Sequence, residues 1–169
     1  MKRLTLLFVA AALTISALAQ TPKGVKYVFT EASELNLIGK IHDNTPNPYH
    51  RVDTVKYKGF TKSENRQVRC PAGMAVLFKT NSTVITVKTD FGWEWESVST
   101  MPIAYRGYDL YIKKDGKWLW AAANAPKHGS TAEDNLVLIN NMDNSEKECL
   151  LYMPNYSEVY SCKIGVQEG

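Results

Sequence analysis

The chain has 169 residues, of which 44% are hydrophobic and 22% are charged, and its formal net charge is +3. A chain of this length can bury enough surface for one core, so we expect a single domain. The small net charge gives no electrostatic reason to expect a nucleic acid or an anionic membrane as a partner.

The first nineteen residues are typical of a secretory signal peptide. Lys2 and Arg3 give a basic start, residues 4–13 are almost continuously apolar, and residues 17–19 read Ala-Leu-Ala, a small-x-small cleavage site. The apolar stretch is too short for a comfortable membrane span. We therefore predict a cleaved leader, a mature domain over residues 20–169 without a membrane span, and export to the periplasm or the extracellular medium.

The segments that follow the leader alternate between apolar and polar residues, and no amphipathic helix of three turns is visible. Residues 33–38 predict a short strand or a single helical turn. β-Branched runs at 76–80 and 83–88 flank a polar turn at Asn81-Ser82. Such a pattern is typical of a β-hairpin.

A second hairpin is predicted around Asp115-Gly116, between alternating segments at 109–113 and 118–120. Asp-Gly in this position is among the strongest short-range hairpin signals, because both residues tolerate a positive φ. The sequence therefore predicts a hairpin here.

The last third of the chain carries strand signals at 136–139, 148–153 and 159–166. The last two strands would pair around a turn at Asn155-Tyr156. With seven to ten short strands and frequent turn clusters, the sequence predicts an all-β fold, a β-sandwich that is jelly-roll-like.

Three cysteines follow the leader: Cys70, Cys149 and Cys162. Export makes disulfides possible, but an odd number leaves at least one cysteine unpaired within the chain. A hairpin around residues 155–156 would place Cys149 opposite Cys162, within reach of a disulfide. The alternative is that both are small buried hydrophobic residues that never form a bond. The sequence favours neither interpretation.

No catalytic group is predicted from the residues themselves. An esterase needs an activated nucleophile, a base and donors for an oxyanion. Gly129-Ser130 follows His128 directly, but neighbours in sequence cannot generally fold back into a nucleophile–base pair, so we expect a loop there. A site built from His50, Asp53 and Asp109 is the remaining enzymatic hypothesis.

Metal and cofactor motifs are also missing from the sequence. It contains no Cys-x-x-Cys, no His-x-x-x-His, no acidic loop of calcium-binding spacing and no Gly-rich phosphate loop. His42-Asp43 and His50 could ligate a metal, but scattered histidines in a loop are mostly solvated. We therefore expect neither a metal nor a cofactor.

Tryptophans are the main chemical feature of the sequence. Trp93 and Trp95 are two residues apart, as are Trp118 and Trp120, so each pair would share one strand face. Flat rings on a rigid sheet can stack against sugar rings. The alternative is that the rings fill the core or a domain interface, which is the commoner role of tryptophan in a sandwich.

Residues 106–111 read Arg-Gly-Tyr-Asp-Leu-Tyr and contain the pattern Gly-x-Asp-Leu-Tyr. Here the chain resembles the family named for that GxDLY motif, which precedes a GDSL-like lipase/acylhydrolase domain in exported bacterial proteins. Stretches at 48–53, 72–82, 151–156 and 164–166 also match the family pattern. Together they extend the resemblance over most of residues 25–169.

The resemblance implies a β-sandwich ahead of an SGNH-type catalytic α/β domain, lying in the same gene or lost. The catalytic serine of SGNH enzymes lies in a Gly-Asp-Ser block and the base in Asp-x-x-His, and the chain contains neither. The resemblance also implies carbohydrate esters as substrates of the complete enzyme, with a polysaccharide as the wider partner. On this basis we expect a non-catalytic accessory domain.

The family motifs suggest residues for binding or for a domain interface. In an extended strand, Tyr108 and Tyr111 would point to opposite faces, and Gly107 would permit a bend or a positive φ before the strand. Asp109 could cap a turn or hold an arginine by a charge-assisted bond. Arg51 and Asp53 would share a strand face as a solvated ion pair.

Two main hypotheses follow from the sequence. An accessory domain that packs against an esterase domain would leave an apolar, aromatic patch exposed on the isolated chain. An independent carbohydrate-binding module would instead expose coplanar tryptophans and would bind glycans without a partner.

Overall fold

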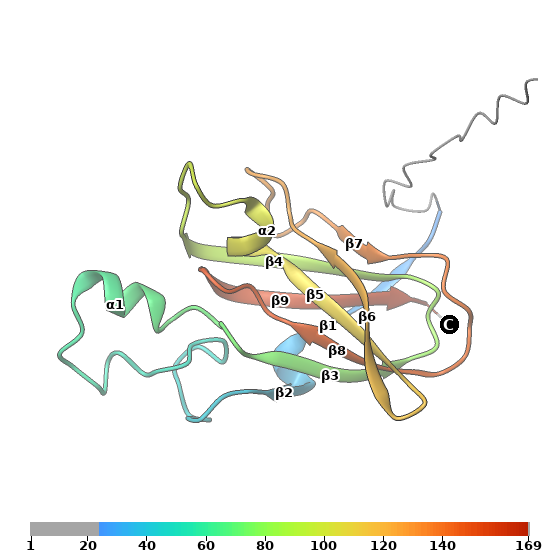
Figure 1. The fold of residues 1–169 in the computed structure, drawn as a ribbon, viewed down its shortest axis with the longest axis horizontal. Coiled ribbons are helices and arrows are strands. Elements are labelled where there is room, and N and C mark those ends of the chain that lie inside the picture. The colour runs from blue at the N-terminus through green and yellow to red at the C-terminus, as the bar shows by residue number, and fades with distance from the viewer. Residues whose placement is uncertain (1–23, 169) are drawn as a thin grey trace, which may run out of the picture.

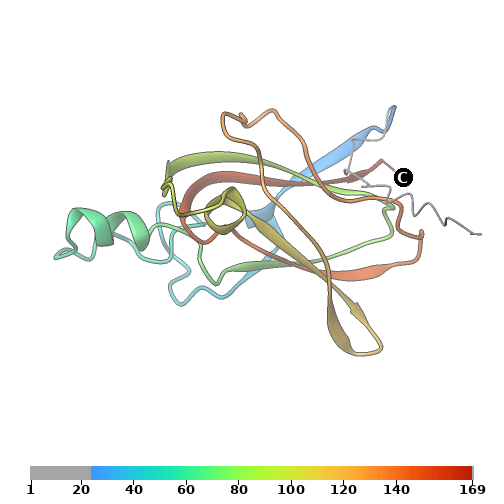
Figure 2. The same cartoon turned by 45° about the horizontal axis from the view of Figure 1, so that its top comes forward.

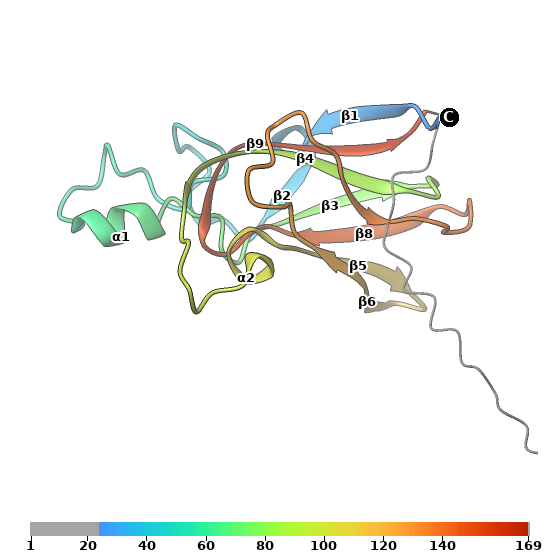
Figure 3. The same cartoon turned by 90° about the horizontal axis from the view of Figure 1, so that it is seen from above.

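The computed structural model describes residues 24–168, so the predicted leader and its cleavage site lie outside the described residues. The described residues form two antiparallel sheets packed face to face (Figures 1 and 3). One sheet has four strands, in the order β1 (Tyr27–Glu31), β9 (Ser157–Gln167), β4 (Ile85–Glu94) and β7 (Leu136–Ile139). The other has five, in the order β2 (Asn36–Ile38), β3 (Ala75–Thr80), β8 (Lys147–Tyr152), β5 (Tyr108–Lys114) and β6 (Lys117–Asn124).

The strand order is that of a jelly roll, which agrees with the predicted fold class, a jelly-roll-like β-sandwich. Apart from the short edge strand β2 and the β5–β6 hairpin, consecutive strands alternate between the two sheets. The first and last strands pair side by side, with Tyr27 opposite Gln167. This alternation is the double Greek key pattern of jelly rolls.

The core lies between the two sheets and consists of the inward-facing residues of both. Ile85 and Val87 on β4 face the same interior as Leu110 on β5 and Leu151 on β8, and all four are fully buried. Burying each such side chain contributes roughly 1.5–3 kcal/mol. The two-residue alternation along each strand therefore accounts for the sandwich.

The hairpin predicted at Asp-Gly is confirmed. From Tyr111 opposite Trp120, past a register shift after Leu110, β5 and β6 pair without interruption up to Lys114 opposite Lys117, which leaves Asp115 and Gly116 as a two-residue turn. Their φ angles are 51° and 75°. Both values are positive, as a type I′ turn requires.

The other two predicted hairpins are wrong, because both connections cross from one sheet to the other. β3 and β4 lie in different sheets, and so do β8 and β9. The polar segments between them bond elsewhere: the amide of Gln167 donates to the Ser82 hydroxyl over 3.0 Å, and the amide of Met153 donates to Met74 O over 3.0 Å. These long-range bonds replace the local turns that residue type alone suggests.

The cysteine result follows from this correction. Cys149 lies opposite Phe78 and Ile112 in the five-stranded sheet, whereas Cys162 lies opposite Thr89 in the four-stranded sheet. The hairpin that would have placed them opposite each other does not exist, and all three cysteines are free and buried. The interpretation as small buried hydrophobic residues therefore holds.

Helices play a small part in the described fold. The 3₁₀ turn η1 (Ala32–Glu34) precedes β2, so residues 33–38 contain both predicted alternatives, a helical turn and a short strand. Helices α1 (Lys62–Gln67) and α2 (Pro102–Arg106) have six and five residues. Over residues 24–168, no helix has the length and apolar character needed to cross a membrane.

Candidate functional site

The long connections gather at one end of the sandwich. Helices α1 and α2, the end of β4 and the turn between β8 and β9 lie there, and the C-terminal end of β9 lies at the opposite end (Figure 1). We refer to the first as the loop end. It holds both predicted Trp93 and Trp95 and most of the buried charges.

A cavity of about 280 Å³ opens at the loop end, lined by Gln67, Trp95, Thr100 and Tyr156. These residues come from the end of α1, the segment after β4 and the β8–β9 turn. Two of them are aromatic and none carries a formal charge. We call this feature the loop-end cavity.

Trp95 is held in place by its backbone and by the second ring of its pair. Its amide donates to Tyr156 O over 2.9 Å. Its ring meets that of Trp93 edge to face, with centroids 5.8 Å apart and planes at 84°. The guanidinium of Arg66 lies 5.3 Å from the centroid of the Trp93 ring. The pair is therefore not the coplanar platform expected of a flat sugar-binding face, and neither ring belongs to the core.

Arg106 forms a deeply buried ion pair at the loop end. Its side chain is 3% exposed and binds Glu94 at both carboxylate oxygens, with Nε 2.8 Å from Oε1 and Nη2 against Oε2. Its Nη1 donates to Lys127 O. The Glu94 carboxylate therefore turns inward to a buried cation.

Glu158 forms a second buried charge cluster. Its side chain is 2% exposed, and Oε1 lies 2.8 Å from both Arg69 Nη1 and His50 Nε2. The amide of Trp93 donates to Oε2 over 3.3 Å. The imidazole is within ion-pair distance but is not aligned for a hydrogen bond. Burial lowers the pKa of His50, partly offset by the Glu158 carboxylate.

Buried ion pairs seldom add net stability over apolar residues of equal size, since removing two charges from water is costly. Here the two ion pairs hold backbone segments in position. Glu94 precedes Trp95 directly, and Glu158 is two residues after Tyr156. The charged groups therefore fix the backbone of the segments that line the loop-end cavity.

The predicted residues Arg51 and Asp53 lie in a loop, not on a strand, and do not pair with each other. Arg51 donates to Cys70 O over 2.8 Å and to Gln67 O over 2.6 Å, which fastens the loop to the end of α1. The Asp53 carboxylate accepts from the backbone amides of residues 55 and 56. Both have structural roles, and the predicted strand-face ion pair is wrong.

The GxDLY motif places its two tyrosines on opposite faces, as expected. Tyr108 is fully buried, and its hydroxyl lies 2.7 Å from Thr89 Oγ1. Burial raises the pKa of Tyr108 well above its ordinary value. Tyr111 lies on the outer face, where its ring meets that of Tyr152 at 5.8 Å. Asp109 is exposed on that face and pairs with neither Arg51 nor Arg106.

Gly107 has a different role from the one predicted. Its φ is −78°, so it does not need a positive φ. A Cβ atom at this position would lie 2.1 Å from Ile103 O. Glycine is required because α2 packs against the start of β5 without room for a side chain.

Trp118 and Trp120 lie far from the loop end, on a projecting part of the β5–β6 hairpin. We call residues 113–120 the β5–β6 arm (Figure 2). Trp118 is 37% exposed and Trp120 is 61% exposed on one face of the arm, while Leu119 is 49% exposed on the other. Lys113 Nζ lies 5.6 Å from the centroid of the Trp118 ring and 2.9 Å from the Glu148 carboxylate.

The enzymatic hypothesis finds no assembled site. His50 faces buried Glu158, Asp53 caps a loop and Asp109 is on the outer sheet face, so each has different surroundings. Within residues 24–168, no three His, Cys, Asp or Glu side chains gather as metal ligands. His128, which precedes Gly129-Ser130, lies on the surface and pairs with Glu96 at 3.0 Å.

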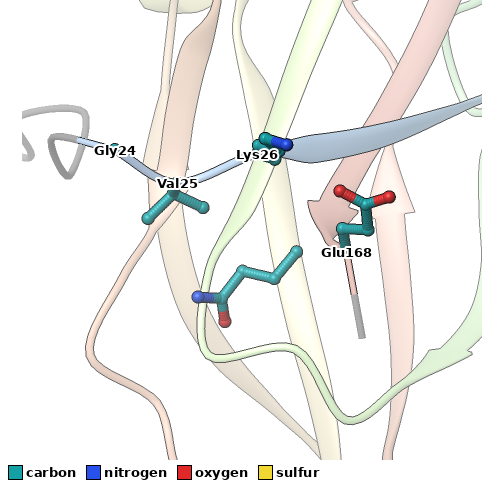
Figure 4. Close-up of a pocket in the computed structure, with 5 residues that line it drawn as sticks. Gly24, Val25, Lys26 and Glu168 are labelled. Atoms are coloured by element: carbon teal, nitrogen blue, oxygen red, sulfur yellow. The ribbon is translucent and has the colours of Figure 1, made fainter.

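A further cavity, of about 430 Å³, lies at the opposite end of the sandwich. Figure 4 shows Gly24, Val25, Lys26 and Glu168 around it, where the first and last described residues meet. The amide of Glu168 donates to Lys26 O over 3.1 Å. This cavity reflects the pairing of β1 with β9 and assembles no reactive group.

Residues 25–169 match the GxDLY family model, described as the N-terminus of SGNH-hydrolase-type esterases. The chain belongs to this family. The GxDLY domain is also similar to a solved structure from Bacteroides ovatus, described as a candidate GDSL-like lipase, with 38% identity and a TM-score of 0.75. That match covers 83% of this chain but 41% of the other, so the chain spans about two fifths of that protein. No curated protein matches the chain.

Sequence reasoning found part of the loop end and missed the rest. Trp95 was singled out by its spacing, but Gln67 and Thr100 carry no signal in the sequence. Tyr156 was assigned to a hairpin turn that does not form. The buried roles of Glu94 and Glu158 depend on partners distant in the sequence, which no local pattern reveals.

Proposed function

We propose that the GxDLY domain is the non-catalytic accessory domain of an SGNH-type esterase, and that it packs against the catalytic domain and helps to shape its cleft. The observation that carries this proposal is the β5–β6 arm. Its large apolar side chains are exposed on both faces, at positions that the core of the sandwich does not reach.

Exposure on both faces distinguishes the arm from an ordinary solvated strand. Trp118 and Trp120 project from one side and Leu119 from the other, so an external surface must enclose the arm to cover all three. Exposed apolar patches of this kind mark interaction sites. Aromatic residues are also the commonest anchors of protein interfaces.

The position of the arm supports a catalytic domain as the occupant. In all three views the arm points toward the same end of the molecule as the C-terminal end of β9 (Figures 1 to 3). The Bacteroides ovatus protein extends well beyond the region shared with this chain. A following domain would therefore begin at the end of the sandwich that carries the arm.

The chemistry of the described residues also supports an accessory role. Burial raises the pKa of Cys70 and of Cys149 to about 11 and that of Cys162 to about 12. A thiol must ionise to act as a nucleophile, so these three are inert at neutral pH. The domain offers surfaces to a partner rather than reactive groups of its own.

The finer parts of the proposal concern substrate and location. We propose carbohydrate esters as the substrates of the complete enzyme and export as its destination. The first is supported by the resemblance of the GxDLY motifs to this class of exported hydrolases, and the second by the residues of the leader. Hydrolysis of acetylated xylan by the complete enzyme, and mass determination of the secreted chain, would test them.

A chimera tests the docking proposal. Residues 25–169 replace the matching domain of the Bacteroides ovatus protein, and thermal stability and hydrolysis of p-nitrophenyl acetate are measured. Trp118→Ser with Trp120→Ser should lower the melting temperature of the catalytic domain and reduce its activity. Trp95→Ser, which removes a tryptophan about as exposed as Trp118 but at the loop end, is the control and should change neither. Equal behaviour of both variants would contradict docking through the arm.

A further inference from the structure

The geometry points to a separate binding function at the loop end: the loop-end cavity binds one sugar ring of a neutral polysaccharide. This function lies beyond the proposed docking, because helix α1 and the end of β4, next to which the lining residues lie, are at the opposite end of the sandwich from the tip of the β5–β6 arm (Figure 1). It would hold the domain on a polymer without involving the arm.

The chemistry of the lining selects the class of ligand. Trp95 and Tyr156 are 40% and 49% exposed, so each keeps ring surface available for contact. Gln67 supplies an amide and Thr100 a hydroxyl, groups that both donate and accept hydrogen bonds. A pyranose ring has apolar C–H faces and neutral hydroxyl edges, which match aromatic rings and neutral polar groups respectively.

Other ligand classes match this lining less well. No cationic residue lines the cavity, and the nearby Arg66 already lies over the ring of Trp93, so an anion has no counter-charge. A fully apolar ligand would leave the Gln67 amide with only its 3.5 Å contact to Ser63 Oγ and would give the Thr100 hydroxyl no partner, which costs binding energy. A neutral sugar can contact the aromatic rings with its C–H groups and bond to the neutral polar side chains with its hydroxyls.

The segments that line the cavity are fixed before any ligand arrives. The carbonyl of Gln67 accepts from Arg51 over 2.6 Å. The amide of Trp95 donates to Tyr156 O over 2.9 Å, the amide of Tyr156 donates to Tyr105 O over 3.2 Å, and the amide of Thr100 donates to Ser97 O over 3.0 Å. A preorganised site loses less conformational entropy on binding.

The buried ion pairs are a second, independent observation. Arg106 with Glu94, and Arg69 with Glu158, hold the strand ends that carry Trp95 and Tyr156. Such pairs are costly to bury, and here they tie together the strand ends next to the cavity. These buried charges therefore lie next to the segments that carry the two partly exposed aromatic rings and the neutral polar groups of the cavity.

Isothermal titration calorimetry on the purified chain tests the proposal. The probes are hexasaccharides of β-1,4-linked xylose, glucose and mannose. At least one should bind, and Trp95→Ala and Tyr156→Ala should each weaken binding by about tenfold, equivalent to about 1.4 kcal/mol. The matched control, Trp120→Ala, removes a more exposed tryptophan on the arm and should leave affinity unchanged. Circular dichroism confirms that each variant is folded.

Several outcomes would overturn the proposal. These are an absence of heat with all three neutral hexasaccharides, binding that survives Trp95→Ala but is lost with Trp120→Ala, and preference for polygalacturonate or for a proline-rich peptide. A further variant, Thr100→Val, keeps the shape of the side chain and removes its hydroxyl, so it should weaken sugar binding without altering the fold. None of these results bears on the chimera assay, so the two proposals can fail separately.

Discussion

The buried pair between Arg106 and Glu94 allows the sharpest test of how the loop end is held together. In Arg106→Met, the carboxylate of Glu94, 17% exposed, loses its cation, and the carbonyl of Lys127 loses a donor. Breaking a buried pair by removing one partner costs about 3–5 kcal/mol. That loss is a large part of the total stability of a small domain, about 5–15 kcal/mol.

Urea unfolding followed by tryptophan fluorescence measures this loss. The double variant Arg106→Met with Glu94→Met should be more stable than Arg106→Met alone, because it leaves no charge unpaired. Lys113→Met is the control, since Lys113 and Glu148 are 36% and 44% exposed and such pairs contribute about 0–1 kcal/mol. A loss in Arg106→Met no larger than in Lys113→Met would refute the assignment of a fixing role to the buried pair.

Three other predictions follow from contacts described above. The pKa of His50 is lowered in the folded state, so as the pH falls below about 6.5 this histidine takes up a proton in the unfolded chain before it does so in the folded chain. The urea midpoint of unfolding should therefore drop between pH 7.5 and pH 5, and His50→Gln should reduce that drop. Gly107→Ala should destabilise the domain by about 1–3 kcal/mol, measured by thermal unfolding, because its Cβ would meet Ile103 O; a neutral effect would contradict that contact. Ellman's reagent should find no reactive thiol in the native chain and three after denaturation without reductant, whereas a single thiol would indicate a disulfide.

The sequence was most informative where structure is local. The Asp115-Gly116 turn needs only two residues that accept a positive φ, so its hairpin could be placed with the correct register. The positions of most strands follow from two-residue alternation. Their partners do not, since a β-branched run packs equally well against a neighbour in sequence or a distant strand. The segments after Thr80 and Tyr152 therefore cross between sheets where hairpins were expected.

The candidate site was only partly predictable for the same reason. The spacing of Trp93 and Trp95 identified an aromatic feature, but not that their rings meet edge to face. The cavity needs Gln67 and Tyr156, which come from segments far apart in the sequence. Arg51 and Asp53 were noted as a charged pair, yet each bonds to backbone groups of its own surroundings. Tertiary partners, which no single segment encodes, decide each of these roles.

The adjacency of the first and last strands has a consequence for biosynthesis. β9 lies between β1 and β4, so the four-stranded sheet cannot be completed until the last strand has left the ribosome. Contacts between such distant parts of a chain also form slowly, because the chain must lose the entropy of closing a long loop before these contacts stabilise it. Until β9 has been synthesised, β1 therefore has no partner strand in this sheet and β4 can pair with β7 alone, which leaves strand edges exposed to aggregation.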